Sequence, residues 1–193
     1  MSLKPFDTDF SLIHALKNRP DFARPLLDLS EAVMRSEGAL EPWQRELTFT
    51  YVSGRNRCGF CRESHSVVLE KFGFDRSLID ALIDQDDFER IEEKLRPILK
   101  YAKKLSEAPE TLTRTDADAV TSAGWSEAAF TELNWVCALA EFFNTLVAGL
   151  GISVDEQLTR FGGDQIHAHG YAKFKSLLPV SSNPEVRLNE RSD

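Results

Sequence analysis

The chain has 193 residues, of which 42% are hydrophobic and 28% charged, an ordinary balance for one globular domain. Its net charge of −8 disfavours nucleic-acid binding as a main role, because an acidic protein repels phosphates. No run of about 18 apolar residues could span a membrane, and the N-terminus does not resemble a secretory signal. Three cysteines are too few for a disulfide framework, so we expect a reducing, cytoplasmic setting.

Apolar residues recur at helical spacing along most of the chain, without the alternation typical of strands. The sequence therefore predicts an all-α fold. We expect a single domain over residues 1–193, with a core at about 20–152 and a C-terminal extension and tail at 153–193. The expected helices lie at about 10–17, 22–35, 42–53, 56–73, 77–83, 91–105, 115–123 and 127–150, with a last one at about 171–178.

The run at about 127–150 is apolar on nearly every side, so it predicts a buried central helix. Four polar residues form a line along it, which we interpret as an interface or a core network before a substrate site: Asn134, Cys137, Glu141 and Asn144. In the helix at about 22–35, one face carries Phe22, Leu26, Leu29 and Val33. After residue 155 the pattern is weak and interrupted by glycines, and residues 180–193 are predicted to form a mobile tail.

Two cysteines and a histidine lie close together in a helix predicted to begin near Asn56. Cys58 and Cys61 are three residues apart, so both sulfurs can lie on one side of the helix and approach bonding distance. His65 is one turn beyond Cys61 and can take a proton from it. The start of a helix stabilises a thiolate, most strongly at Cys58, and nearby cations add to this effect: Arg55, Arg57 and Arg62.

Glu46 lies upstream, in the helix predicted at 42–53, on the same face as Trp43 and Thr50. A carboxylate among apolar neighbours tends to have a raised pKa, which would suit a proton-transfer group. A boundary glutamate paired with an arginine is the alternative, and the helix pattern alone favours it.

Other chemistries fit the two cysteines less well than a redox dithiol. Zinc would need a fourth ligand, and Cys137 lies far away in an apolar helix, where we expect it to be a core residue. Covalent haem attachment would need a histidine in place of Arg62, and a thioredoxin-like motif would follow a strand. His167 and His169 are expected to be surface residues. We therefore expect no metal and no cofactor.

The motif resembles the active site of the AhpD-like alkylhydroperoxidases, which belong to the carboxymuconolactone decarboxylase superfamily. Glu46 is followed after eleven residues by Cys58-Gly59-Phe60-Cys61 and, after three more, by His65. Segments at 95–105, 112–116, 123–126 and 143–151 are similar to the peroxidase-related branch of that family, so the resemblance covers about residues 20–152. One departure is Phe60, which stands where the related AhpD proteins have a histidine.

The resemblance implies an all-α, AhpD-like helical bundle that assembles into homo-oligomers. It also implies that Cys61 attacks a hydroperoxide, that Cys58 resolves the product to a disulfide, and that Glu46 draws the proton from Cys61 through His65. The argument from the helix start gives Cys58 the lower thiol pKa, whereas the family places the attack at Cys61. We follow the family, because His65 is within reach of Cys61.

The sequence thus predicts a thiol-dependent alkylhydroperoxide reductase. Its expected partners are a hydroperoxide substrate, an external dithiol reductant or a partner peroxiredoxin, and further copies of the chain. No nucleic acid or membrane is expected. Two alternatives remain, namely a cysteine-independent decarboxylase-like enzyme of the same superfamily and a redox-sensing or interaction module whose disulfide changes the oligomer.

Overall fold

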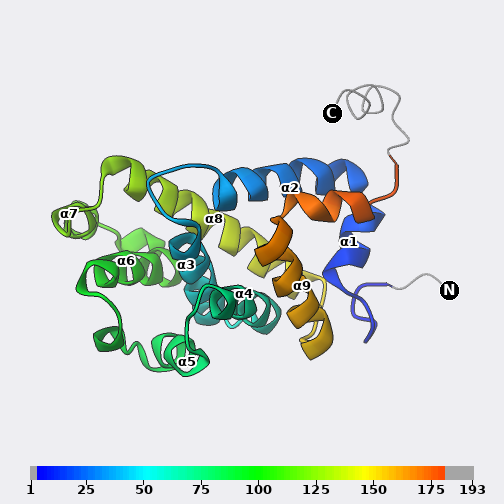
Figure 1. Cartoon of the computed structure of the whole chain (residues 1–193), viewed down its shortest axis with the longest axis horizontal. Helices are drawn as coiled ribbons and strands as arrows, with labels where there is room; N and C mark the ends of the chain where they lie inside the picture. The colour runs from blue at the N-terminus through cyan, green and yellow to red at the C-terminus, as the bar shows by residue number, and fades with distance from the viewer. Residues whose placement is uncertain (1–3, 181–193) are drawn as a thin grey trace.

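The computed structural model describes residues 4–180, and every regular element in that part is helical, which confirms the all-α prediction. Figure 1 shows the helices packed around α3 and α8. The α-helices are α1 (Leu12–Asn18), α2 (Pro20–Arg35), α3 (Pro42–Arg55), α4 (Gly59–Lys71), α5 (Arg76–Gln85), α6 (Arg96–Glu107), α7 (Arg114–Ser122), α8 (Glu127–Gly149) and α9 (Glu156–His169). Short 3₁₀ helices are η1 (Phe88–Arg90), η2 (Glu93–Leu95), η3 (Pro109–Thr111) and η4 (Ala172–Leu177).

Helix α3 is the most deeply buried helix of the fold. Pro42 occupies its first turn, and the Gln44 side chain accepts a hydrogen bond from the Glu41 N–H, so the start of the helix is well defined. Every residue from Arg45 to Ser53 is buried, because α4, α6 and α8 pack around this segment. A polar side chain placed here is removed from water and needs a partner within the protein.

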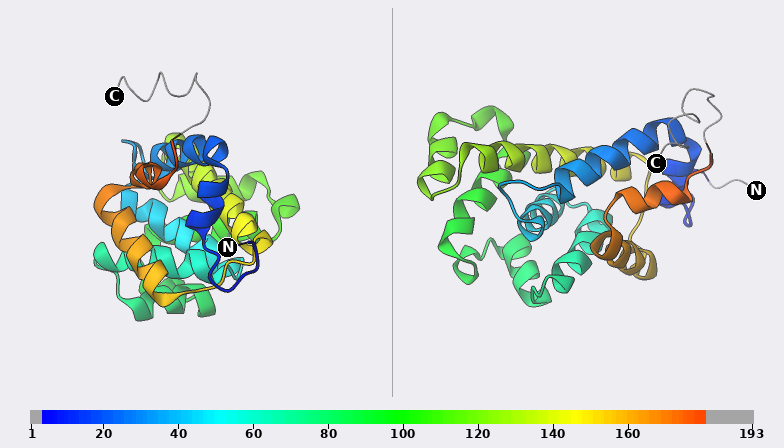
Figure 2. Two further views of the ribbon diagram at one scale, coloured as in Figure 1. Left: turned by 90° about the vertical axis from the view of Figure 1, so that its right-hand side faces the viewer. Right: turned by 45° about the horizontal axis from the view of Figure 1, so that its top comes forward.

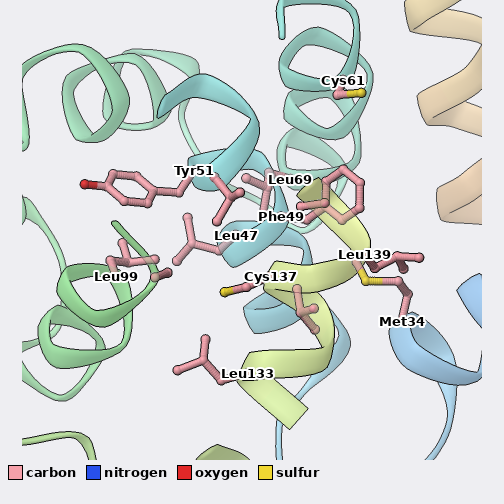
Figure 3. Close-up of a cluster of buried hydrophobic side chains, with 14 of the residues drawn as sticks. Met34, Leu47, Phe49, Tyr51, Cys61, Leu69, Leu99, Leu133, Cys137 and Leu139 are labelled. Carbon is pink, nitrogen blue, oxygen red and sulfur yellow. The ribbon is translucent and has the colours of Figure 1, made fainter. Parts of the chain in front are cut away.

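Helix α8, predicted to be the buried central helix, is buried on one side only. Leu133 and Cys137 lie in the core with residues of α3 and α6 (Figure 3), whereas Trp135 and Phe142 are 56% and 50% exposed. The prediction is wrong on this point because a run that is apolar on all sides carries no periodic signal for its outer face. The polar line includes a core network, in which Asn134 accepts from the Tyr101 hydroxyl and Glu141 from Asn56.

Helix α2 buries a different face from the one that its large apolar residues suggest. Phe22 and Leu29 are 61% and 44% exposed. The buried residues lie one position further along the helix: Ala23, Leu27, Ser30 and Met34. Helix α2 packs against η4 and α8, and Ala23 lies in a small cluster with Leu16, Leu27 and Leu178.

The chain turns sharply between α3 and α4, and the turn sets the position of the first cysteine. Helix α3 continues to Arg55, and Asn56 caps its C-terminus rather than starting the next helix, which corrects the prediction. Arg57 has a positive φ of 57°, and α4 begins at Gly59 with Cys58 at its N-cap. The two cysteines are 8% and 3% exposed, so both thiols are buried.

The sequence does not predict helix α9, because Gly162 and Gly163 interrupt its helical pattern. The Asp155 side chain caps it by accepting from the Leu158 N–H. Gly163 faces α4, and a Cβ there would lie 2.6 Å from the Ser64 carbonyl oxygen. This glycine therefore permits close packing of α9 on α4.

The chain after α9 returns to α2, where the backbone N–H groups of Tyr171 and Ala172 donate to the Glu31 carboxylate. Figure 2 shows this orange segment, η4, beside the blue α1 and α2. The predicted last helix at 171–178 is thus the 3₁₀ helix η4. Of the predicted tail only Val180 is described, and the rest lies outside the described residues.

Candidate active site

Glu46 and His65 meet in the interior, between α3 and α4. Glu46 Oε2 lies 2.6 Å from His65 Nδ1, and the Glu46 side chain is fully buried. The packing of α4 on α3 brings these two side chains together, as the motif spacing suggested. The Phe49 ring stacks on the histidine ring, with ring centroids 3.9 Å apart.

Two further residues complete this group, and the sequence did not single out either of them. Arg35, at the end of α2, places Nη2 2.6 Å from Glu46 Oε1. Tyr171 donates its hydroxyl hydrogen to the same oxygen over 2.9 Å, and the hydroxyl lies 3.5 Å from His65 Nδ1. Glu46 is thus paired with an arginine, as the alternative interpretation held, but it is fully buried and not at a boundary, and it is also bonded to the histidine.

The charges around Glu46 decide its protonation state. Burial raises the pKa of a carboxyl group, but the interactions with His65 and Arg35 outweigh burial, so the pKa of Glu46 is lowered. The expectation of a raised pKa is wrong, because it considered the apolar neighbours without these partners. Burial and the Glu46 charge raise the pKa of Tyr171 well above its usual value, so its hydroxyl stays protonated and acts as a donor.

An ionised Glu46 also fixes the tautomer of neutral His65. A carboxylate can only accept, so Nδ1 must carry the hydrogen of their 2.6 Å bond. The second ring nitrogen, Nε2, is then the basic atom that can take up a proton. A carboxylate behind a histidine orients the ring.

The two cysteines form no disulfide and are hydrogen-bonded to each other at the start of α4. A hydrogen bond from Cys61 lowers the pKa of the Cys58 thiol, and the same bond together with burial raises the pKa of Cys61. The lower pKa of Cys58 agrees with the argument from the helix start, although its main cause is Cys61. Figure 3 shows the Cys61 sulfur pointing away from the core, toward α9.

A cavity of about 190 Å³ lies between α4 and the two ends of the chain, and Cys61 and His65 form part of its wall. Most of the other lining residues are apolar, among them Leu16, Leu27, Phe143, Leu158, Phe161 and Phe174. Phe60, the residue that departs from the AhpD pattern, also lines it. Cys58 does not. The thiol that a ligand in the cavity would meet is therefore that of Cys61.

The remaining candidate residues lie elsewhere. His167 and His169 are exposed in the last turn of α9, as expected, and the His167 ring packs against Phe72. Cys137 is a buried core residue. Within residues 4–180, no three histidine, cysteine or acidic side chains are grouped so that they could hold a metal ion. No helix there is long and apolar enough to cross a bilayer.

Comparisons with known proteins agree with this fold. A model of the carboxymuconolactone decarboxylase family matches residues 20–104. An uncharacterised peroxidase-related protein from Silicibacter sp. TM1040 has a TM-score of 0.71 and 17% identity, over 76% of each chain. A peroxidase-related protein with an alkylhydroperoxidase AhpD core, from Ralstonia eutropha JMP134, has a TM-score of 0.70 and 21% identity, over 77% of this chain and 78% of that one.

A third solved structure is a variant of the debrominase Bmp8 in complex with 2,3,4-tribromopyrrole. It has a TM-score of 0.66 and 19% identity, over 80% of this chain and 81% of that one. No protein of curated function matches the sequence. The family match includes Arg35, Glu46, both motif cysteines and His65, and it ends well before Tyr171.

Proposed function

Because this chain belongs to the carboxymuconolactone decarboxylase superfamily and has an AhpD-like fold, we propose that it is a thiol-dependent hydroperoxide reductase. The observation that carries the proposal is the cavity wall, on which Cys61 stands beside a histidine whose Nδ1 is bound to a buried carboxylate. A thiol, a base and a ligand-sized space are the parts that thiol peroxidation requires.

Because the pKa of the Cys61 thiol is raised, its ionisation needs a base, and in the first step His65 Nε2 takes the proton of Cys61, supported by Glu46 through Nδ1. The Cys61 thiolate attacks the terminal oxygen of the hydroperoxide, so an S–O bond forms and the O–O bond breaks. The sulfur is oxidised to a sulfenic acid and the peroxide is reduced. The leaving alkoxide takes the proton from His65 and departs as an alcohol.

In the second step Cys58 attacks the sulfur of the sulfenic acid. An S–S bond forms, the S–O bond breaks, and the oxygen leaves as water after taking up a proton. Cys58 attacks as the thiolate, which is the reactive form of a resolving thiol. An external dithiol then reduces the disulfide by thiol–disulfide exchange and is itself oxidised. A partner peroxiredoxin would accept electrons from the reduced pair. We propose that the enzyme works as a homo-oligomer in the cytoplasm.

A steady-state peroxidase assay with several dithiol donors tests this function. We expect Cys61→Ser to abolish hydroperoxide consumption, because no other thiol faces the cavity. Glu46→Gln and His65→Gln should slow it, by the factor of about 10² to 10⁴ that general base catalysis contributes. Cys137→Ser is the matched control, since this buried thiol lies away from the cavity.

A Cys61→Ser variant that kept the parent rate would refute the proposal. Unreactive thiols in an otherwise folded protein would favour the decarboxylase-like alternative. Oxidation to the disulfide without repeated turnover would favour a redox sensor.

A second candidate is reductive dehalogenation of an aromatic ring, the kind of activity named for the debrominase Bmp8. The apolar cavity beside Cys61 favours it, because its volume of about 190 Å³ suits a single ring. The dithiol would supply two electrons, so that the carbon–bromine bond is replaced by a carbon–hydrogen bond while a disulfide and hydrogen bromide form. Release of bromide from 2,3,4-tribromopyrrole by the reduced protein, compared with peroxide consumption, distinguishes the two.

A further inference from the structure

The walls of the cavity come largely from outside the segment that matches the family. Leu16 is contributed by α1, Leu158 and Phe161 by α9, and Phe174 by η4, whereas the family match covers residues 20–104. The reactive thiol and histidine are thus part of the shared core, and the ligand space is built by the two ends of this chain. The residues that form these walls should therefore indicate which kind of ligand the cavity binds.

Size and charge restrict what can enter. An apolar cavity of about 150 Å³ inside a protein stays dry and binds benzene, and the cavity here measures about 190 Å³. Among the described residues, its lining contains no aspartate, glutamate, lysine or arginine. A charged ligand would lose its hydration without gaining a counter-charge, and a small polar peroxide would leave most of the apolar wall uncovered.

One polar side chain on the wall lacks a partner. Ser11 is bonded to His14, and both His65 and Tyr171 are bonded to Glu46. Ser64, which is 5% exposed, has no hydrogen-bond partner for Oγ among the described residues. It lines the cavity three residues after Cys61, on the same side of α4, so a ligand atom near the Cys61 sulfur is also near the Ser64 side chain.

We propose that the cavity binds an uncharged ligand with one aromatic ring, and that the Ser64 hydroxyl holds the ligand's polar oxygen beside Cys61. This proposal rests on the proposed function. For that reaction it names the substrate class as a neutral aryl-alkyl hydroperoxide. The ring fills the space between α1, α9 and η4, and the peroxide group meets Cys61, Ser64 and His65. Ser64 acts as a positioning residue for the oxygen that Cys61 attacks.

Binding of cumyl alcohol, the alcohol formed from cumene hydroperoxide, tests the site without turnover. We expect isothermal titration of the reduced protein to show binding, and benzoate to bind at least ten-fold more weakly. Ser64→Ala should weaken cumyl alcohol binding about five-fold, the value of one ordinary hydrogen bond. Ser66→Ala is the matched control, because Ser66 is also buried on α4 with an unpartnered Oγ but does not line the cavity.

A space-filling variant gives an independent measurement. Gly162 lines the cavity, and a Cβ there would meet no other atom within 4 Å, so Gly162→Leu should fit in the helix and abolish cumyl alcohol binding. In the parent enzyme, kcat/KM should be at least ten-fold higher for cumene hydroperoxide than for hydrogen peroxide. Gly162→Leu should reduce this ratio.

The outcomes separate this inference from the proposed function. If cumyl alcohol binds as expected but no hydroperoxide is reduced, the ligand site stands and the peroxidase function fails. If hydroperoxides are reduced but cumyl alcohol does not bind, or if Ser66→Ala weakens binding as much as Ser64→Ala, the ligand site is refuted while the peroxidase function stands.

Discussion

At the scale of single residues, the unusual feature is a full negative charge in the centre of the fold. Glu46 is completely buried, yet its pKa is lowered, because Arg35 and His65 lie 2.6 Å away on its two oxygens and Tyr171 donates a third bond. A buried charge is tolerated when its hydrogen-bonding capacity is satisfied in this way. The same contacts that stabilise the carboxylate also hold the His65 ring in place.

The lowered pKa makes a prediction about stability in acid. Ionised Glu46 stabilises the fold at pH values above about 4.5, its ordinary pKa, and this contribution is lost as the pH falls from there through the folded-state pKa. Glu46→Gln should lower the free energy of unfolding by about 3 kcal/mol at neutral pH, because it leaves Arg35 without its partner. Its stability should then fall less steeply in acid than that of the parent.

Urea unfolding at a series of pH values measures both effects. Glu110→Gln, at an exposed position, is the control and should follow the parent. Parallel loss of stability in the parent and in Glu46→Gln would show that Glu46 does not carry the charge.

At the scale of the helices, the site depends on how closely α9 approaches α4. Gly163 lies where a Cβ would be 2.6 Å from the Ser64 carbonyl oxygen and 2.7 Å from Val67 Cβ. A side chain at residue 163 would collide with backbone, which cannot move aside as a flexible side chain can. Helix α9 would then have to shift away from α4. Since α9 supplies one wall of the cavity, this contact links the packing of the fold to the ligand space.

Two adjacent glycines allow a matched test of this contact. Gly163→Ala should lower the free energy of unfolding by about 2 kcal/mol, as overpacking does. Gly162→Ala should raise it by about 0.5–1 kcal/mol, because its Cβ meets open space and alanine favours the helix. Denaturant midpoints compare the two, and equal stabilities would show that α9 does not pack tightly on α4.

At the scale of the whole molecule, the site joins segments that are far apart in the sequence, and this decided what could be predicted. The all-α fold followed from helical spacing, and Cys58, Cys61 and His65 followed from a motif within eight residues. Arg35 and Tyr171 could not be found in this way, because each reaches Glu46 only through the packing of its segment.

The errors in predicting α9 and α8 have a related cause. Helix α9 has a glycine, Gly163, where it touches α4, so its sequence looks like a loop until the neighbour is known. Helix α8 is apolar all round, so nothing in its sequence marks Trp135 as exposed. The spacing of apolar residues along the sequence shows which residues share one face of a helix. Whether that face is buried depends on the helix that packs against it.

The central claim is that Cys58 and Cys61 form a dithiol that a hydroperoxide oxidises. Mass spectrometry of the reduced protein after one equivalent of cumene hydroperoxide tests it most directly. We predict a rapid loss of two hydrogens from the protein, a peptide cross-link between Cys58 and Cys61, and an unmodified Cys137. Free thiols at both positions while the peroxide persists would contradict the account.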